Sequence, residues 1–234
     1  MISSERTPVV RRLLGTCLLA CLLSACQPSM DEVIAEHRAA VQGVFGKLKA
    51  LDAPARSAPP TLEDTMAAGG ARVVLDGQAS NALFILAEDL QAPEFASSDG
   101  VGATYAKTVQ VCGEALRGEA QGVPKGIESF MKECGRAEYV FVLRRTAEES
   151  AQSVDNDSFQ AGMYEGDVLL FRLADGSSLG GFRVSAKSSD QIMAQVDANG
   201  NPVDISERLE SDLSAELFAD IGTKIRKHLP GALP

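Results

Sequence analysis

Tyr139-Val140-Phe141-Val142-Leu143 is the clearest strand in this 234-residue sequence, and it decides the fold. β-branched and aromatic residues follow one another here without a polar interruption, and such side chains suit a pleated, buried surface. A strand that is buried on both faces shows a continuous apolar run instead of strict alternation. The stretch therefore predicts a central strand of a sheet.

Further strands are expected on both sides of this segment. Downstream, residues 163–173 and 179–186 flank an Asp-Gly turn and predict a hairpin. Upstream, residues 72–75 and 82–87 predict two strands joined by a tight connection. Residues 191–196 are expected to add another strand. The polar, acidic and serine-rich residues between about 146 and 160 predict a loop, as do residues 93–102.

A helix is predicted from about Met30 to Leu51. Ser29 and Glu32 have the spacing of a capping box, in which each side chain bonds the other's backbone N–H. Behind the box, apolar residues recur at alternating spacings of three and four, so they share one helical face. The stripe consists of Ile34, His37, Val41, Val44, Leu48 and Leu51. A coiled coil is the alternative, but the stripe is short and contains two glycines, so an amphipathic helix packed on the domain is favoured.

Two short helices are predicted in the middle of the chain. In the first, Cys112 lies on the same face as the apolar residues between 105 and 116. In the second, which begins at Pro124, Cys134 shares the apolar face. Both cysteines are therefore expected on the buried faces of neighbouring helices.

The last helix is predicted to open at Asp204 or Ser206. Its apolar residues recur every four positions, a step that gains about 40° per repeat, so the stripe winds around the helix. One face is then expected to pack on the sheet while the last turn meets something else. Acidic residues lead and basic residues close the helix, which matches the helix dipole and indicates a solvated basic end rather than a membrane contact.

Together these elements predict an α+β fold. A mixed or antiparallel sheet is expected with helices packed on one face, an N-terminal helix and a C-terminal amphipathic helix. Residues 53–61 are rich in Pro, Ala and Ser and are interpreted as a linker. The main α+β domain is accordingly assigned to residues 62–234.

The N-terminal segment has the organisation of an export signal. Three arginines precede an apolar run, residues 13–23, which has the length of a signal peptide's core and is too short to span a bilayer. The run ends in Leu23-Ser24-Ala25-Cys26, and this order resembles the lipobox of bacterial lipoproteins. The alternatives are an ordinary cleavable signal, a short membrane anchor, or a twin-arginine signal at Arg11-Arg12, whose neighbouring residues fit that signal poorly.

The resemblance implies a specific processing of the chain. Residues 1–25 would be a signal peptide cleaved between Ala25 and Cys26, and the Cys26 thiol would carry fatty acyl chains such as palmitate. Two or more chains make such an anchor effectively permanent. In lipoproteins of this type an aspartate after the cysteine favours the inner membrane, so Gln27 implies the outer membrane and a protein facing the periplasm. Residues 26–52 would then form the lipidated N-terminus and first helix.

The charge of the processed chain restricts its partners. The signal contains three of the 22 basic and one of the 32 acidic residues, which leaves 19 basic and 31 acidic residues and a formal net charge of −12. Such a chain does not hold nucleic acid or an anionic lipid surface by electrostatics. Contact with the membrane is therefore expected through the acyl chains on Cys26 alone, and an envelope protein is the partner expected.

Cys112 and Cys134 are the only cysteines left after the signal and the lipidated residue are set aside. In an oxidising compartment an even pair predicts a disulfide. The alternatives are a thiol active site, which usually has Cys-x-x-Cys spacing, and a zinc site, which needs about four ligands. With only two histidines in the chain, neither alternative assembles easily.

No catalytic motif is recognised, and neither a metal site nor a cofactor is expected. Residues 197–201 are similar to the start of a calcium loop, but the glycine is misplaced and a turn explains the same residues. His37 and His228 have no evident partner in the sequence. Beyond the lipobox the chain resembles uncharacterised proteobacterial lipoproteins, a likeness that carries no activity. The sequence favours a non-enzymatic binding or envelope-assembly module, with a cell-envelope hydrolase of unrecognised active site as the alternative.

Overall fold

The computed structural model describes most of the chain after the predicted signal peptide. Ala25 and Cys26, the strand expected at residues 191–196 and the calcium-like residues 197–201 lie outside the described residues. The described ranges are 28–61, 64–66, 71–76, 79–97, 100–153, 159–189 and 206–233.

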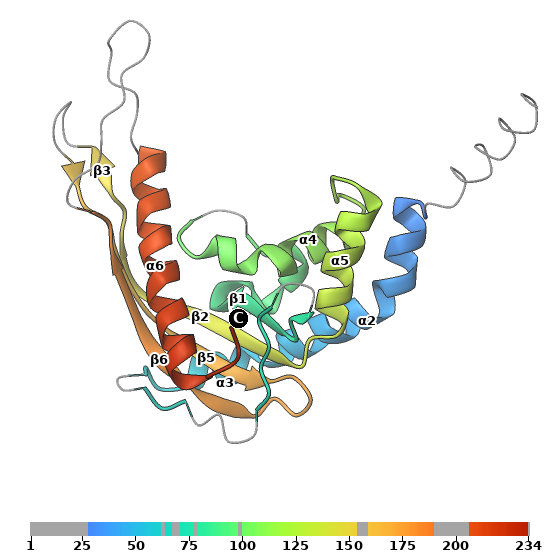
Figure 1. Ribbon diagram of the computed structural model, residues 1–234, viewed down its shortest axis with the longest axis horizontal. Helices are drawn as coiled ribbons and strands as arrows, with labels where there is room; N and C mark the ends of the chain where they lie inside the picture. The colour runs from blue at the N-terminus through green and yellow to red at the C-terminus, as the bar shows by residue number, and fades with distance from the viewer. Residues whose placement is uncertain are drawn as a thin grey trace, which may run out of the picture.

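A four-stranded mixed sheet forms the centre of the fold (Figure 1). The strand order is β1 (Ala82–Leu86), β2 (Tyr139–Glu149), β5 (Met163–Arg172) and β6 (Ser178–Lys187). β1 runs parallel to β2, whereas the β2–β5 and β5–β6 pairs are antiparallel. The predictions of a central strand at 139–143, a hairpin at 163–186 and an α+β fold with a mixed sheet are confirmed.

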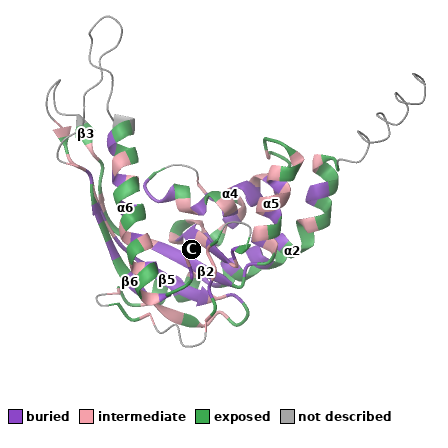
Figure 2. Ribbon diagram, in the orientation of Figure 1, coloured by how far each residue is buried: buried purple, intermediate pink, exposed green. Residues whose placement is uncertain are grey.

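Helices cover both faces of this sheet. Val140 and Val142 face the core that contains α2 (Met30–Ala50), α4 (Lys107–Arg117) and α5 (Pro124–Gly135). Phe141 and Leu143 point the opposite way and pack with α6 (Ser206–His228). The expectation that the helices share one face is therefore wrong in this detail. A strand with apolar residues on both sides needs cover on both, and Figure 2 shows buried residues where the helices meet the sheet.

The first helix confirms its prediction closely. The Ser29 hydroxyl accepts the backbone N–H of Glu32, and the Glu32 carboxylate accepts the N–H of Ser29, so the capping box is complete. Val41 and Leu48 are fully buried and share a core with Val140 on the sheet. α2 is thus an integral packed helix and part of the same core as the main domain.

Residues 53–61 are not a linker. They include all but the first residue of α3 (Asp52–Ser57), and the backbone carbonyls of Ala55, Ala58 and Pro59 accept hydrogen bonds from the guanidinium of Arg144. Pro and Ala also suit the first turn of a helix, which is why the composition alone misled. Asp167 completes this attachment, because it pairs with Arg144 and accepts the N–H of Thr61 at 2.8 Å.

Two strand assignments also differ from the sequence prediction. Residues 72–75 form no strand; the Asn81 side chain bonds the N–H of Val74 and the C=O of Arg72 in place of a partner strand. The loop expected at 146–160 is partly sheet, because β2 continues to Glu149 and is followed by β3 (Gln152–Ser153) and β4 (Phe159–Gln160). The backbone hydrogen bonds of a sheet do not depend on the polarity of the side chains. The acidic composition of residues 146–160 therefore predicted a loop although part of the segment is paired in a sheet.

The C-terminal helix confirms the predicted stripe of apolar residues at four-residue spacing. All six members are buried, at 5% exposure or less: Leu209, Leu213, Leu217, Ile221, Ile225 and Leu229. Among the described residues, no helix is both long and apolar enough to span a membrane.

Candidate functional site

The structure brings together one of the site pairs expected from the sequence. Cys112 and Cys134 form a disulfide that joins α4 to α5, with their Cα atoms 6.7 Å apart and both residues fully buried. His37 and His228 lie apart, on α2 and α6, and His228 has a partner that the sequence did not indicate. Its Nε2 lies 2.9 Å from a carboxylate oxygen of Asp64, which also pairs with Lys227. Within the described ranges, no group of three or more candidate ligands is placed to hold a metal ion.

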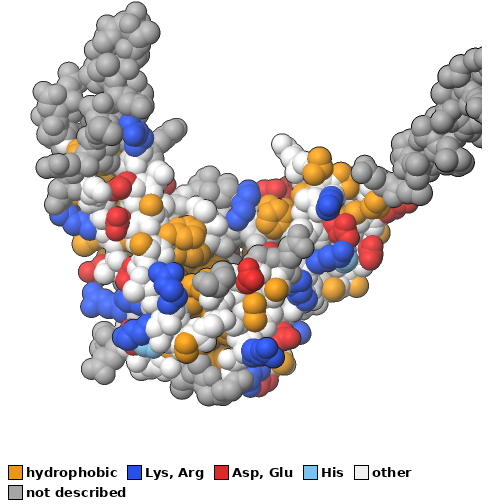
Figure 3. All heavy atoms as spheres, viewed as in Figure 1, with side chains coloured by type: hydrophobic (Ala, Val, Ile, Leu, Met, Phe, Trp, Pro, Cys, Tyr) orange, Lys and Arg blue, Asp and Glu red, His pale blue; other side chains and the backbone are white. Residues whose placement is uncertain are grey.

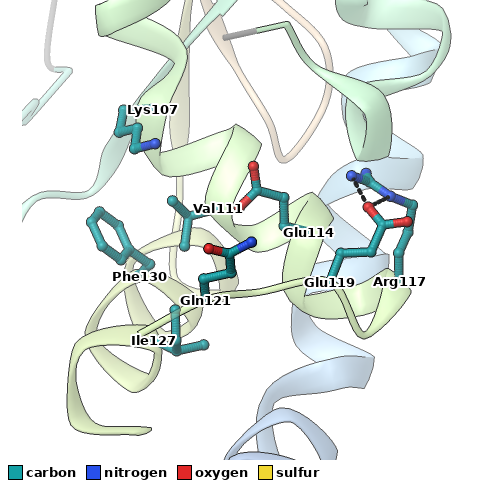
Figure 4. Close-up of a pocket in the computed structure, with 8 residues that line it drawn as sticks. All are labelled: Lys107, Val111, Glu114, Arg117, Glu119, Gln121, Ile127 and Phe130. Atoms are coloured by element: carbon teal, nitrogen blue, oxygen red, sulfur yellow. Dashed lines mark hydrogen bonds and ion pairs between the residues drawn. The ribbon is translucent and has the colours of Figure 1, made fainter. Parts of the chain in front are cut away.

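One hollow lies beside the disulfide-linked helices α4 and α5 (Figure 4). Its volume is about 580 Å³, and its apolar floor is formed by Val111, Ile127 and Phe130. The charged groups around it already bond within the protein: Arg117 pairs with Glu119, and Glu114 accepts a hydrogen bond from Gln110. This hollow offers few unsatisfied groups to a ligand.

A second hollow, here named the β1–α6 groove, is more apolar. It has a volume of about 500 Å³ and lies between the edge of β1, the C-terminal half of α6 and the facing parts of α4 and α5. Figure 3 shows hydrophobic side chains gathered in the hollow between α6 and the α4–α5 pair. The groove is lined by Leu75, Ser80, Ala82, Leu83, Phe84, Tyr105, Thr108, Glu133, Phe218, Ile221, Gly222, Ile225, Arg226 and Leu233.

Aromatic rings form one wall of this groove. Phe84 on β1 stacks on Phe141 of β2 with ring centroids 4.6 Å apart, and Tyr105 lies 4.9 Å from Phe84. Phe218 of α6 then stacks on Tyr105 at 3.7 Å, and the Tyr105 hydroxyl donates to the Phe218 carbonyl. Burial raises the pKa of Tyr105, so its phenol remains a neutral donor. The rings link the sheet to α6 and leave Phe218 37% exposed.

The opposite end of the groove contains Glu133 of α5. Burial raises the pKa of this carboxyl group, while the charge of Arg136 and the nearby Ser80 and Thr108 hydroxyls oppose that rise. Arg136 also donates to the Ser80 carbonyl at 2.8 Å. Cys134 follows Glu133 directly in the sequence, so the disulfide ties this turn of α5 to α4.

Arg226 supplies the positive charge on the α6 side. The neighbouring cations Lys224 and Lys227 are paired with Asp220 and Asp64, but Arg226 has no ion pair with any residue that the structure describes. It lines the groove beside Gly222, whose missing side chain leaves space for the guanidinium. Among the described residues, the groove thus combines an apolar body with one carboxyl group and one cation that has no ion pair, an arrangement typical of a ligand site.

Sequence patterns did not indicate this groove, because the residues that line it come from segments far apart along the chain. Phe218 appeared only as a residue that widened an apolar stripe, and Tyr105 only as part of a helical face. Phe218 lies beside the apolar stripe of α6, and that stripe is long enough to bury the helix without it. This additional aromatic residue was the one sequence signal for a second contact on α6.

Comparison with protein-family models, with curated proteins and with solved structures finds no match to this chain.

Proposed function

We propose that this protein is a lipid-anchored binding module of the bacterial cell envelope, and that the β1–α6 groove holds an apolar segment of a partner protein. The observation that carries the proposal is the groove itself: about 500 Å³ with an apolar body, an exposed aromatic ring and a cation, Arg226, that forms no ion pair with the described residues. Contiguous exposed apolar surface on a soluble domain marks interaction sites.

Two features support the location. The lipobox at residues 23–26 implies an anchor on Cys26 in the outer membrane, with the domain facing the periplasm. The buried Cys112–Cys134 disulfide suits an oxidising compartment such as the periplasm. α2 begins at Met30, so the packed domain starts within a few residues of the proposed acyl chains.

A cell-envelope hydrolase is the second candidate, and the raised pKa of Glu133 in the groove is the observation that favours it. Hydrolysis by paired carboxyl groups requires a second acid at a defined distance from the first. Glu133 is the only carboxyl residue among the described residues that line the groove. Binding is therefore the better supported function.

Site-specific cross-linking in native envelopes tests the binding function. A photo-reactive amino acid is placed at Phe218, and the matched control is placed at Val123, which is 70% exposed and does not line the groove. We expect a discrete cross-linked protein from position 218 and none from position 123. Equal products from both positions, or none from position 218, would contradict the proposal.

The anchor is tested separately with Cys26→Ser. The substitution removes the thiol that would carry the lipid, so the protein is expected to leave the membrane fraction or to retain its signal peptide. Mass spectrometry of the wild-type N-terminus is expected to show acyl chains on Cys26. An unmodified Cys26 in membrane-bound protein refutes lipidation.

A further inference from the structure

The turn between α4 and α5 ends in Val123, whose side chain is 70% exposed. The two other large apolar residues that are exposed among the described residues have ring contacts. Phe218 stacks on Tyr105, and the guanidinium of Arg117 lies 4.7 Å from the centre of the Phe95 ring. Val123 projects into solvent instead. Because single exposed apolar residues are common, the position of Val123 in the fold decides whether it has a function.

Valine contributes little to the fold at this position. Val123 is the N-cap of α5, and its side chain makes no capping hydrogen bond. Asp, Asn, Ser and Thr are preferred there because their side-chain oxygen accepts a helix N–H, and valine is among the poorest choices. The Val123 carbonyl accepts the N–H groups of Gly126 and Ile127 at 2.9 and 3.2 Å, which fixes the backbone. The end of α5 therefore presents an apolar side chain that gives the helix neither burial nor a cap.

Val123 lies at the end of the domain where the chain arrives from Cys26. In Figure 1, α2 and α5 begin at the same end of the molecule and run in the same direction. They come close together at Gly135, where an added Cβ would lie 3.0 Å from that of Ala40. Eleven residues earlier on each helix, Pro124 comes level with Ser29. The N-terminus of α2 and the exposed valine thus share one end of the domain.

The proposed anchor holds this end near a bilayer. Cys26 precedes Ser29 by three residues, and three extended residues span at most about 11 Å. The acyl chains on Cys26 would lie within the bilayer, so the first turn of α2 is kept within about that distance of the lipid surface. Val123 is at the same level and meets lipid without any rearrangement of the domain.

The charges at this end indicate that such a contact is apolar. Asp31 and Glu32 are in the first turn of α2, so attraction to an anionic surface is not expected. In the turn, Glu119 is paired with Arg117. Lys125 follows Val123 by two residues and is exposed. A lysine beside an apolar contact suits a lipid interface, because its stem lies along the apolar layer while its ammonium group reaches the headgroups.

We propose that Val123 inserts into the lipid surface beside the acyl chains of Cys26, so that the α4–α5 turn forms a second contact with the bilayer. The inference rests on the proposed lipid anchor and is independent of what the β1–α6 groove binds. An anchor alone leaves the domain free to rotate about residues 26–29, whereas a second contact fixes the first turns of α2 and α5 toward the membrane. An apolar pocket of another protein would also cover a valine, but the anchor supplies lipid at this distance.

Spin labels on the full-length acylated protein in phosphatidylcholine vesicles test the inference. With Cys26 acylated and Cys112 bonded to Cys134, a cysteine introduced at Gln121 is the only free thiol of the processed chain. The matched control is a label at Ser57, which is exposed on α3 beyond the C-terminal end of α2. We expect the label at 121 to collide with lipid-soluble oxygen several-fold more often, relative to a water-soluble nickel chelate, than the label at 57.

Substitutions of Val123 then test whether its side chain makes the contact. Val123→Asp is expected to lower the collision ratio at 121 to that at 57, whereas Val123→Leu should maintain or raise it. Asp is a favoured N-cap, so Val123→Asp is expected to retain α5, which circular dichroism checks. Ala53→Asp is the matched control, since it makes the same charge change at an exposed position on α3, and it should leave the ratio unchanged.

The outcomes separate this inference from the proposals on the anchor and the groove. If Cys26 is acylated but the labels at 121 and 57 give equal ratios, or if Val123→Asp changes nothing, the inference is overturned and the anchor stands. If the contact is lost in about 1 M salt, where charges are screened beyond about 3 Å, charged groups make it and the inference is again overturned. A discrete protein cross-linked from position 123 would refute lipid as the occupant. If Cys26 is unmodified, the anchor and this inference both fail, while the groove is tested independently at Phe218.

Discussion

Reduction of the Cys112–Cys134 disulfide is expected to lower the free energy of unfolding by about 3.4 kcal/mol. The two residues are 22 positions apart in the sequence. Closing a loop of that length removes about 11 cal/mol/K of chain entropy from the unfolded state, which gives about 3.4 kcal/mol at 25 °C. Both cysteines are fully buried, so reduction exposes no apolar surface in the folded state. The expected change in the free energy of unfolding is therefore the loop-closure effect only.

Urea unfolding followed by circular dichroism measures this difference. Three samples are compared in detergent: the oxidised protein, the reduced protein, and the C112A/C134A variant. The oxidised and reduced proteins differ by the cross-link, whereas the reduced protein and the double variant differ only by the packing of the two sulfur atoms. We expect the first difference to be about 3.4 kcal/mol, and the slope against urea to rise on reduction because the unfolded chain expands.

The same experiment has a functional consequence. The Cys134 sulfur lies 3.5 Å from the Thr108 carbonyl, and both Thr108 and Glu133 line the β1–α6 groove. Reduction is therefore expected to weaken binding at the groove before it unfolds the sheet. If the oxidised and reduced proteins unfold at the same urea concentration, the cross-link does not constrain the unfolded chain and the reasoning is refuted.

Five further substitutions test packing and charge by urea unfolding. Gly113→Ala is expected to cost about 1–3 kcal/mol, because the new Cβ would lie 2.5 Å from a backbone carbonyl oxygen, whereas Gly43→Ala, which meets nothing within 4 Å, should stabilise its helix by about 1 kcal/mol. Burial disfavours the charged form of Glu133 and so raises its pKa. Glu133→Gln is therefore expected to raise the free energy of unfolding at neutral pH. This gain should disappear as the pH falls below the carboxyl pKa, where the wild-type residue is neutral too. Glu128→Gln, on the same helix, should show the opposite sign at neutral pH, since the hydrogen bond from a neighbouring lysine lowers the pKa of Glu128. Asp167→Asn is expected to cost about 3 kcal/mol because it leaves a largely buried guanidinium without its counter-charge; a loss below about 1 kcal/mol would contradict that assignment.

Local patterns in the sequence were sufficient for most of the fold. The capping box at Ser29 and the apolar run at 139–143 act through neighbouring residues, so their outcomes could be predicted without knowledge of the rest of the chain. The disulfide was predictable because both cysteines lay on apolar helical faces. The attachment of residues 58–61 was not predictable, since it depends on Arg144, which lies more than eighty residues away in the sequence.

The candidate site was hidden for the same physical reason. Glu133 and Arg226 are ordinary charged residues of amphipathic helices until the sheet places them beside one hollow. Aromatic contacts such as the Tyr105–Phe218 stack join residues more than a hundred positions apart, and no periodic pattern encodes such a contact. Sequence patterns reveal which face of a helix is buried, but they do not reveal which buried faces leave a space between them.

The winding stripe of α6 explains why a groove forms where it does. Six buried residues at intervals of four rotate by about 200° from Leu209 to Leu229, so no flat sheet can cover all of them. The sheet, chiefly β6, covers part of the helix, and the last residues need another surface. Segment 71–75 and the C-terminal residues supply it, with the N–H of Leu75 bonded to the Ala232 carbonyl at 2.7 Å. Between these two covers, Ile221 and Ile225 pass from one surface to the other and line the groove beside β1, so the position of the groove follows from the four-residue period of the stripe.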